Sequence, residues 1–227
     1  MEALLYDVHG NLPALEAVLE DAAAQGASLY ILGGDYALFG GWPLQTLERL
    51  RRLPNALWIR GNGERWTARP EDAPDNAVVR GAIAAAREAL GKQIVDDLAA
   101  LPASARLRGT LFCHASPESD VVSFQPEPDG NEPDLLAGVT AARLIFGHTH
   151  LPFKRRANGI ELVNPGSVGM PFDHDPRAAY ALVHDDGTIE HRRLDYDYAA
   201  TAAQVRGFGG EWSETVAKRI EQARPDV

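Results

Sequence analysis

The chain has 227 residues, a formal net charge of −10, and 45% hydrophobic and 24% charged residues. These values are typical of one globular domain and argue against disorder or a coiled coil. The acidic balance repels a phosphate backbone and argues against long nucleic acids as partners, although it does not exclude a small phosphate ester held by metal ions. The single cysteine, Cys113, excludes an internal disulfide framework and a cysteine zinc cluster.

The sequence carries no targeting or membrane signal. Its first residues lack the basic region and the long apolar core of a signal peptide. No apolar run approaches the roughly 20 residues that span a bilayer. We therefore expect a soluble, cytoplasmic protein that makes no membrane contact.

Short apolar runs and amphipathic helices alternate in the first sixty residues. A helix is predicted to begin after Asn11, which suits the N-cap, because Leu15, Val18 and Leu19 share one helical face. Gly26 is expected to end this helix. Such alternation predicts βαβ units and a largely parallel sheet, with ligands beyond the carboxyl ends of the strands. The predicted strands are 4–6, 29–32 and 56–59, and the second predicted helix is 44–52.

The rest of the chain is predicted to add one long helix, a surface loop and strands that close the domain. Periodic apolar residues over 77–101 indicate a helix that forms a lid or side wall of the substrate pocket. Residues 115–134, rich in Pro, Asp, Glu, Ser and Gly, are predicted to be a loop. Further strands are predicted at 107–114 and 144–146, followed by antiparallel strands at 159–163, 178–184 and 188–194.

One domain with a helical tail is the simplest division of the chain. We assign residues 1–195 to a domain with a helical insertion at about 65–101. Residues 196–227 are assigned to a C-terminal helical tail packed on the same domain, with a break at 207–210.

Polar residues follow five of the predicted strands directly. Asp7 and His9 stand at positions i and i+2, so in extended geometry both side chains can reach one metal ion. His148 and His150 repeat this spacing, and Gly147 lets the backbone approach closely. The full set of potential ligands is Asp7, His9, Asp35, Asn62, His114, His148 and His150.

The chemistry of this set favours two metal ions over one. Nitrogen and oxygen ligands without a thiolate suit Mn²⁺, Fe, Zn²⁺ or Ni²⁺. If Asp35 bridges, two ions that share it have four protein ligands each and keep positions for water. Taken singly, an Asp or His at a strand end is more often a cap or a hydrogen-bonded core residue. The ordered set, in which each member follows a strand, makes coincidence improbable.

The ordered motifs resemble those of the calcineurin-like metallophosphoesterases. The pattern of that family is Asp-x-His, Gly-Asp, Gly-Asn-His-(Asp/Glu), a later His and Gly-His-x-His. Residues 7–12 and 164–169 are similar to the small bacterial and archaeal branch of phosphodiesterases and phosphatases, and the resemblance covers roughly residues 4–195. The matching segments are Asp7-Val8-His9, Gly34-Asp35, Gly61-Asn62-Gly63-Glu64, His114 and Gly147-His148-Thr149-His150.

The resemblance implies a fold, a metal centre and a reaction. The fold is a four-layer α-β-β-α sandwich of the α/β class. The metals are two divalent transition-metal ions, with manganese favoured over iron, zinc and nickel. A water shared by the ions would attack a small phosphate mono- or diester, because two cations about 3.5–4 Å apart lower its pKa and offset the charge on phosphorus. By resemblance, Asp7, His9 and His150 hold the first ion, Asn62, His114 and His148 hold the second, Asp35 bridges, and Asn62 and His114 are also assigned as catalytic residues.

One position departs from the pattern of the family. The family often has a His after Gly-Asn, which is thought to protonate the leaving oxygen, and this chain has Gly63 there. General acid catalysis contributes about 10²–10⁴ in rate. We therefore expect weak activity on esters with poor leaving groups and better activity on activated aryl esters. The neighbouring Glu64 is interpreted as an exposed loop carboxylate rather than as a substitute acid.

Residues that bind the substrate are marked less clearly. Asn11 can contact phosphate, but its N-cap role already explains it. Arg177 is a candidate for binding an anionic substrate, and a surface salt bridge explains it equally well. Trp66 and Phe172 are candidates for lining the pocket, although core packing explains either of them.

Two other functions fit parts of the pattern. A non-catalytic, metal-binding scaffold of the same fold needs no complete ligand set, so retention of all seven residues favours an enzyme, and only Gly63 favours the scaffold. A metal-dependent amidohydrolase also uses paired histidines but leaves the Gly-Asp and Gly-Asn elements unexplained.

Overall fold

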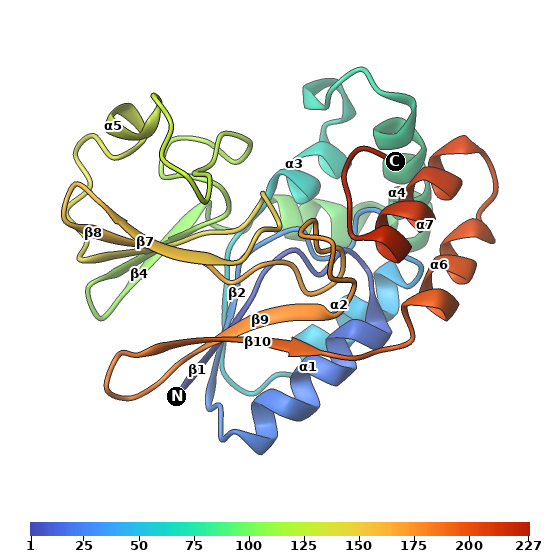
Figure 1. The fold of residues 1–227 in the computed structure, drawn as a ribbon. Helices are drawn as coiled ribbons and strands as arrows, with labels where there is room; N and C mark the ends of the chain where they lie inside the picture. Colours follow the sequence, from blue (N-terminus) through green and yellow to red (C-terminus); the bar gives the residue numbers. More distant parts are fainter.

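Two five-stranded sheets form the centre of the protein in the computed structural model, which describes residues 1–227 (Figure 1). The strand order is β10-β9-β1-β2-β3 in the first sheet and β4-β5-β6-β8-β7 in the second. The first sheet consists of β1 (Glu2–Leu5), β2 (Leu29–Leu32), β3 (Ala56–Trp58), β9 (Ala178–Val183) and β10 (Ile189–Leu194). The second consists of β4 (Ser104–Leu107), β5 (Thr110–Cys113), β6 (Arg143–Ile145), β7 (Phe153–Ala157) and β8 (Ile160–Asn164).

The two sheets pack on each other through one apolar cluster. Alternation along β1 shows how the sequence achieves this, since successive side chains of a strand point to opposite faces. Leu4 belongs to the cluster between the sheets, together with Phe112 and Ile145 of the second sheet. Leu5 belongs to the cluster on the other face, beneath the helices. Both faces of the first sheet are therefore covered, which explains why its strands are continuous apolar runs.

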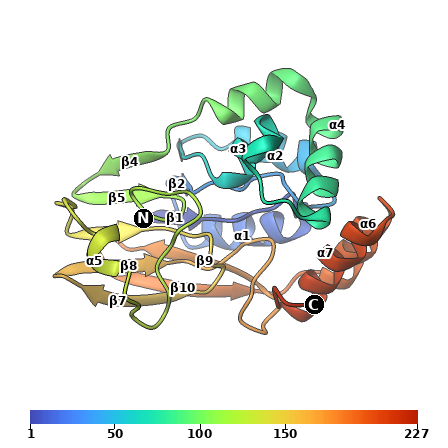
Figure 2. The same cartoon turned by 90° about the horizontal axis from the view of Figure 1, so that it is seen from above.

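Helices α1 (Leu12–Ala24), α2 (Pro43–Arg51) and part of α4 (Ala77–Ala99) cover the outer face of the first sheet (Figure 2). The predicted cap of α1 is confirmed, because the Ala14 amide donates to Asn11 Oδ1 at 3.2 Å. Helix α4 is kinked at Gly91, whose φ of 73° lies outside the helical region. The kink divides α4 between two clusters: Val95 and Leu98 pack with α1 and α2, and the first half packs with Trp66.

The outer face of the second sheet is covered by fewer helical residues than the outer face of the first sheet. Its cluster includes Phe124 from a loop and Leu135 from α5 (Glu132–Leu135), which has four residues. The α/β fold with two sheets flanked by helices is confirmed, but the fourth layer of the expected sandwich is one short helix and a loop.

The remaining helices lie near one end of the sheets. Helix α3 (Asn62–Ala68) follows β3, with a short 3₁₀ turn (Pro70–Asp72) after it, and packs on α4. Helices α6 (Tyr198–Arg206) and α7 (Glu211–Gln222) pack on each other, and α7 also packs on α4. The break expected at 207–210 separates α6 from α7. No helix is both long and apolar enough to cross a membrane.

Strand pairing differs from the prediction in three places. The strand predicted at 107–114 contains β5 but runs across a turn, because Arg108 and Gly109 have positive φ values and reverse the chain after β4. Edge strand β7, rich in Lys and Arg, was not predicted from its charged sequence, as is common for edge strands. Strand β8 pairs parallel with β6, and antiparallel pairs are as numerous as parallel ones. The parallel arrangement predicted from the first sixty residues is confirmed for β1, β2 and β3, whereas each complete sheet is mixed.

Candidate metal centre

The seven predicted ligands come together where five strands end. They follow β1, β2, β3, β5 and β6, strands from both sheets that deliver their polar ends to one place. All are buried except His148, which is partly exposed. Five of them have left-handed backbone conformations, which non-glycine residues rarely adopt outside constrained functional sites: Asp7, His9, Asp35, His148 and His150.

Asp7, His9 and His150 form the first group. The Nε2 atoms of His9 and His150 lie 3.1 Å apart. Asp7 Oδ1 lies 3.4 Å from His150 Nε2 and 3.9 Å from His9 Nε2. All three ligand atoms therefore converge on one point, as a cation site requires.

Asn62, His114 and His148 form the second group. Asn62 Oδ1 lies 2.9 Å from His114 Nε2 and 2.9 Å from His148 Nδ1. Asp35 stands between the two groups. Its Oδ1 lies 3.5 Å from His114 Nε2, and its Oδ2 lies 3.9 Å from His9 Nε2. The carboxylate thus offers one oxygen to each side.

Backbone carbonyls fix the orientation of three histidine rings. His9 Nδ1 donates to Leu38 O at 2.9 Å, His114 Nδ1 to Gly33 O at 2.8 Å, and His150 Nδ1 to Met170 O at 2.5 Å. A histidine whose Nδ1 carries the proton presents the lone pair of Nε2. Each Nε2 faces the centre, so all three rings are set up as ligands.

The pKa values within the centre depend on burial and on close charges. Burial and the nearby His150 lower the pKa of His9 to about 3, and burial and His114 lower that of His148 to about 4. Burial raises the pKa of Asp35 to about 7, with His114 opposing and Glu64 reinforcing the rise. For Asp7, burial is outweighed by the neighbouring histidines, which hold its pKa well below the ordinary value. His9 and His148 are therefore neutral near pH 7, the state in which an imidazole can bind a metal.

Two observations show that the residues fit divalent cations. Asp7 Oδ1 is fully buried and has no hydrogen-bond donor. The end of the Asn62 amide meets the lone pairs of His114 Nε2 and His148 Nδ1; its NH2 group satisfies them in the metal-free protein, and a cation would do so with the amide rotated. Buried lone pairs without donors are costly, and a cation among them removes that cost. The nitrogen and oxygen donors suit a first-row transition metal.

Glycines next to the ligands leave room for the close approach of other atoms. A Cβ on Gly147 would stand 2.4 Å from Asp7 Oδ2, which confirms the close approach expected there. A Cβ on Gly63 would stand 2.9 Å from Asp35 Oδ1, and the Gly63 amide donates to that oxygen at 2.7 Å. Gly63 thus holds Asp35 in place through its backbone.

The interpretation of Glu64 as an exposed carboxylate was wrong. Glu64 is buried, and it accepts from the amides of Asp35 at 2.9 Å, Tyr36 at 2.8 Å and Gly61 at 2.8 Å. Its position in the first turn of α3 lets one carboxylate satisfy donors from two loops. Glu64 therefore ties the Asp35 loop to the Asn62 loop, and its oxygens are engaged in that role.

The two proposed substrate-binding residues are both engaged elsewhere. Asn11 Nδ2 donates to Gly169 O at 2.8 Å and to Tyr196 Oη at 3.1 Å, while its Oδ1 caps α1. Arg177 forms the surface ion pair with Asp175, at 2.7 Å. In both cases the structural role considered from the sequence is the one that the structure shows.

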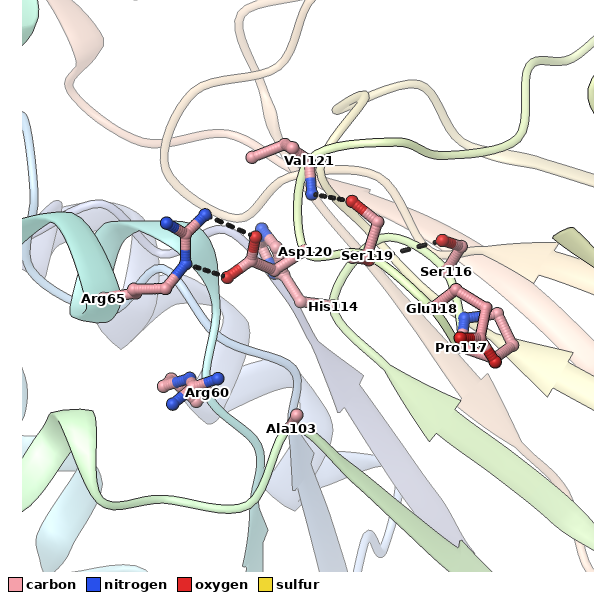
Figure 3. A pocket seen from close by; sticks show the side chains of 10 residues that line it. All are labelled: Arg60, Arg65, Ala103, His114, Ser116, Pro117, Glu118, Ser119, Asp120 and Val121. Carbon is pink, nitrogen blue, oxygen red and sulfur yellow. Dashed lines mark hydrogen bonds and ion pairs between the residues drawn. The ribbon is translucent and has the colours of Figure 1, made fainter. Parts of the chain in front are cut away.

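Two hollows border the second group of ligands. One, of about 330 Å³, is lined by His114, Arg60, Arg65 and the turn 116–121 (Figure 3). The other, of about 350 Å³, is lined by His148, Leu151 and Phe172 among others. Val121 borders both hollows.

The residues that line these hollows do not include the helix that was predicted to form a lid or side wall. No residue of α4 borders either hollow, because its first half packs on α3 and α7 and its second half packs with α1 and α2. Trp66 is in the core, whereas Phe172 borders the second hollow and stacks on the His150 ring with 4.4 Å between centroids. Arg60, Arg65 and Asp120 were missed, because no motif or periodicity marks them.

Comparison with known proteins gives consistent matches over most of the chain. The family model of the calcineurin-like phosphoesterase superfamily domain matches residues 2–187. An uncharacterized protein of Methanocaldococcus jannaschii is 30% identical over 220 residues, covering 87% of this chain and 88% of the relative. The phosphodiesterase YfcE of Escherichia coli is 30% identical over 196 residues, covering 79% of this chain and 85% of the relative. The crystal structure of a metallophosphoesterase from Sphaerobacter thermophilus is 27% identical with a TM-score of 0.82, covering 98% of this chain and 99% of its own.

Proposed function

The chain belongs to the calcineurin-like phosphoesterase superfamily, and we propose that it is an enzyme that hydrolyses a small phosphate ester with the help of two divalent metal ions. The observation that carries the proposal is the convergence of buried carboxylate and imidazole groups on one place, where Asp7 Oδ1 has no hydrogen-bond donor. Metal ions would satisfy this oxygen in an enzyme and in a metal-binding scaffold alike, and membership of a phosphoesterase family favours the enzyme.

The proposed ligands are divided between two positions. Asp7, His9 and His150 would hold one ion, Asn62, His114 and His148 the other, and Asp35 would bridge them. Nitrogen and oxygen donors fit manganese, our preferred metal, as well as iron, zinc or nickel. When bound, two such ions supply a nucleophilic water at neutral pH and offset the negative charge that develops on phosphorus.

The protein's own residues would prepare this chemistry. The Gly63 amide and the Glu64 clamp fix the Asp35 carboxylate and the start of α3 before any ligand arrives. The carbonyls behind His9, His114 and His150 hold three rings in one orientation. Such preorganisation reduces the rearrangement that the reaction requires.

The shape of the surroundings favours a phosphodiester as the substrate. The hollows beside His114 and His148 offer space for two ester groups on one phosphorus. The first contains Arg60, which has no acidic partner, and suits a polar or anionic group, while Phe172 in the second suits a flat apolar group. The name of the E. coli relative, a phosphodiesterase, is consistent with this preference.

A panel of esters tests the proposed function. Purified protein is assayed with bis-p-nitrophenyl phosphate and p-nitrophenyl phosphate, with added Mn²⁺ and with a chelator. We expect hydrolysis that needs the metal and is faster for the diester. Asp35→Asn, which removes the bridging charge, should lower kcat by about a hundredfold or more. Asp21→Asn, in an ion pair outside the centre, is the matched control. Turnover in the chelator, or full activity of Asp35→Asn, would contradict the proposal.

A further inference from the structure

The turn at Ser119–Val121 brings a backbone oxygen to the second group of ligands. The end of the Asn62 amide that faces His114 and His148 also lies 3.0 Å from the carbonyl oxygen of Asp120. The same end of Asn62 therefore stands within 3.0 Å of acceptors from His114, His148 and Asp120. Ligands about 2.1 Å from one ion and at right angles to each other stand about 3 Å apart. The observed separations of 2.9, 2.9 and 3.0 Å match that spacing.

A bidentate ion pair holds this turn against α3. Arg65 Nε donates to Asp120 Oδ2 and a terminal Arg65 nitrogen donates to Asp120 Oδ1, both at 2.7 Å (Figure 3). Both side chains are less than one-fifth exposed. Arg65 lies one turn after Asn62 on α3, so the same short helix carries a proposed ligand and the anchor of the turn.

The turn is also braced from within. Ser119 Oγ accepts from the amides of Val121 at 3.1 Å and Val122 at 3.0 Å, and Ser119 O accepts from the Ser116 amide at 2.9 Å. These bonds fix the direction of the backbone around Asp120. The carbonyl is therefore held toward Asn62 by two independent sets of contacts.

We propose that the Asp120 carbonyl oxygen is a further ligand of the ion held by Asn62, His114 and His148, and that the Arg65–Asp120 ion pair is the positioning device that presents it. The inference rests on the proposed function, since it assumes that this group binds a divalent ion. A carbonyl oxygen is a hard donor that suits manganese better than zinc. The turn thus biases the second position toward manganese.

Arg65 and Asp120 carry opposite charges, so substituting each in turn separates a positioning role from a simple effect of charge. Mn²⁺ binding to metal-free protein is measured by titration calorimetry. Electron paramagnetic resonance follows the spin-coupled signal that appears when two Mn²⁺ ions are bound side by side. Asp120→Ala keeps the carbonyl and removes its anchor, and Arg65→Met removes the other half. Both should weaken the second Mn²⁺ by about tenfold to a hundredfold and leave the first unchanged. Arg65→Lys, which keeps the charge but loses the bidentate geometry, should weaken it less.

Long-range electrostatics alone predicts a different result. Removal of the Arg65 cation would then tighten Mn²⁺ binding, and Arg65→Lys would have no effect. Either result, in protein that binds two Mn²⁺ before substitution, overturns this inference and leaves the proposed function intact. Unsubstituted protein that binds no Mn²⁺ would instead overturn both.

Two controls accompany the test. Asp21→Ala breaks the Arg192–Asp21 pair, which is also bidentate, at 2.6 and 2.8 Å, and lies outside the centre, so both Mn²⁺ affinities should be unchanged. Zn²⁺ titrations of the same variants are the second control. The preference for Mn²⁺ over Zn²⁺ at the second position should fall in Asp120→Ala, and an unchanged preference would contradict the role of the carbonyl.

Discussion

Asp35 is the residue on which both halves of the candidate centre depend. It lies between His9 and His114, and it is buried beside the carboxylate of Glu64. Burial raises its pKa to about 7, so in metal-free protein a proton occupies this carboxyl group in slightly acidic solution. A metal ion that binds there must displace the proton.

This competition predicts how Mn²⁺ affinity depends on pH. As the pH falls through 7, Asp35 becomes protonated, so the apparent affinity should fall by up to about tenfold per pH unit. The carboxylates of Asp35 and Asp7 overcome the effect of burial and raise the pKa of His114, which acts in the same direction. His9 and His148, with pKa values of about 3 and 4, add nothing in this range. Calorimetric titrations at pH 6, 7 and 8 should show more proton release at pH 6; equal affinity at all three would contradict the assignment.

Gly63 is expected to make the reaction sensitive to the leaving group. A glycine side chain cannot protonate the departing oxygen, and the Glu64 carboxylate next to it is occupied by three backbone amides. We expect kcat for a series of aryl phosphodiesters to fall steeply as the pKa of the leaving phenol rises. Methyl aryl phosphates with graded substituents provide the measurement. A flat dependence would show that an acid is present after all.

At the scale of elements, α3 connects the ligand loops. Its first turn carries Asn62 and Glu64, and Glu64 accepts from amides in both neighbouring loops. In Glu64→Gln one oxygen becomes an amide nitrogen, so at least one buried backbone donor loses its acceptor. The free energy of unfolding should fall by about 1–3 kcal/mol. Urea denaturation measures it, with Glu20→Gln on the exposed face of α1 as the control expected to change it by less than about 0.5 kcal/mol.

Elements with local signals were predictable from the sequence, and those without were not. Helix α1 has a cap, an apolar face and a terminating glycine, all of which act within a few residues. The β4–β5 hairpin is an exception, because residues 104–107 alternate in polarity and Gly109 marks the turn, yet the predicted strand ran across it. The pairing of β8 with β6 depends on chain distant in sequence, and no local pattern encodes it.

At the scale of the whole molecule, strand topology explains why the grouping of the seven candidate ligands could be predicted. Each follows an apolar strand, and the fold brings those strand ends together from two sheets. The surroundings of the site were not predictable in the same way. Arg65 and Asp120 are 55 positions apart and carry no motif, and α4 looked like a lid only because its packing on α3 and α7 was unknown.

The charge of the molecule agrees with a small substrate. The chain carries a net charge of −10, and two of its carboxylates, Asp7 and Asp35, are buried in the centre. Two divalent ions would make this place locally positive within an acidic protein. We expect this place to attract a phosphate ester of the size of the hollows and the acidic surface to repel a long polyanion.

A titration of metal-free protein with Mn²⁺ tests the central claim most directly, because it counts ions and turnover together. Bound Mn²⁺ and the hydrolysis rate of bis-p-nitrophenyl phosphate are followed in the same samples. We predict that activity rises to a plateau when two Mn²⁺ ions are bound per chain. Full activity in protein stripped of metal, or a plateau with no bound Mn²⁺, would contradict the account.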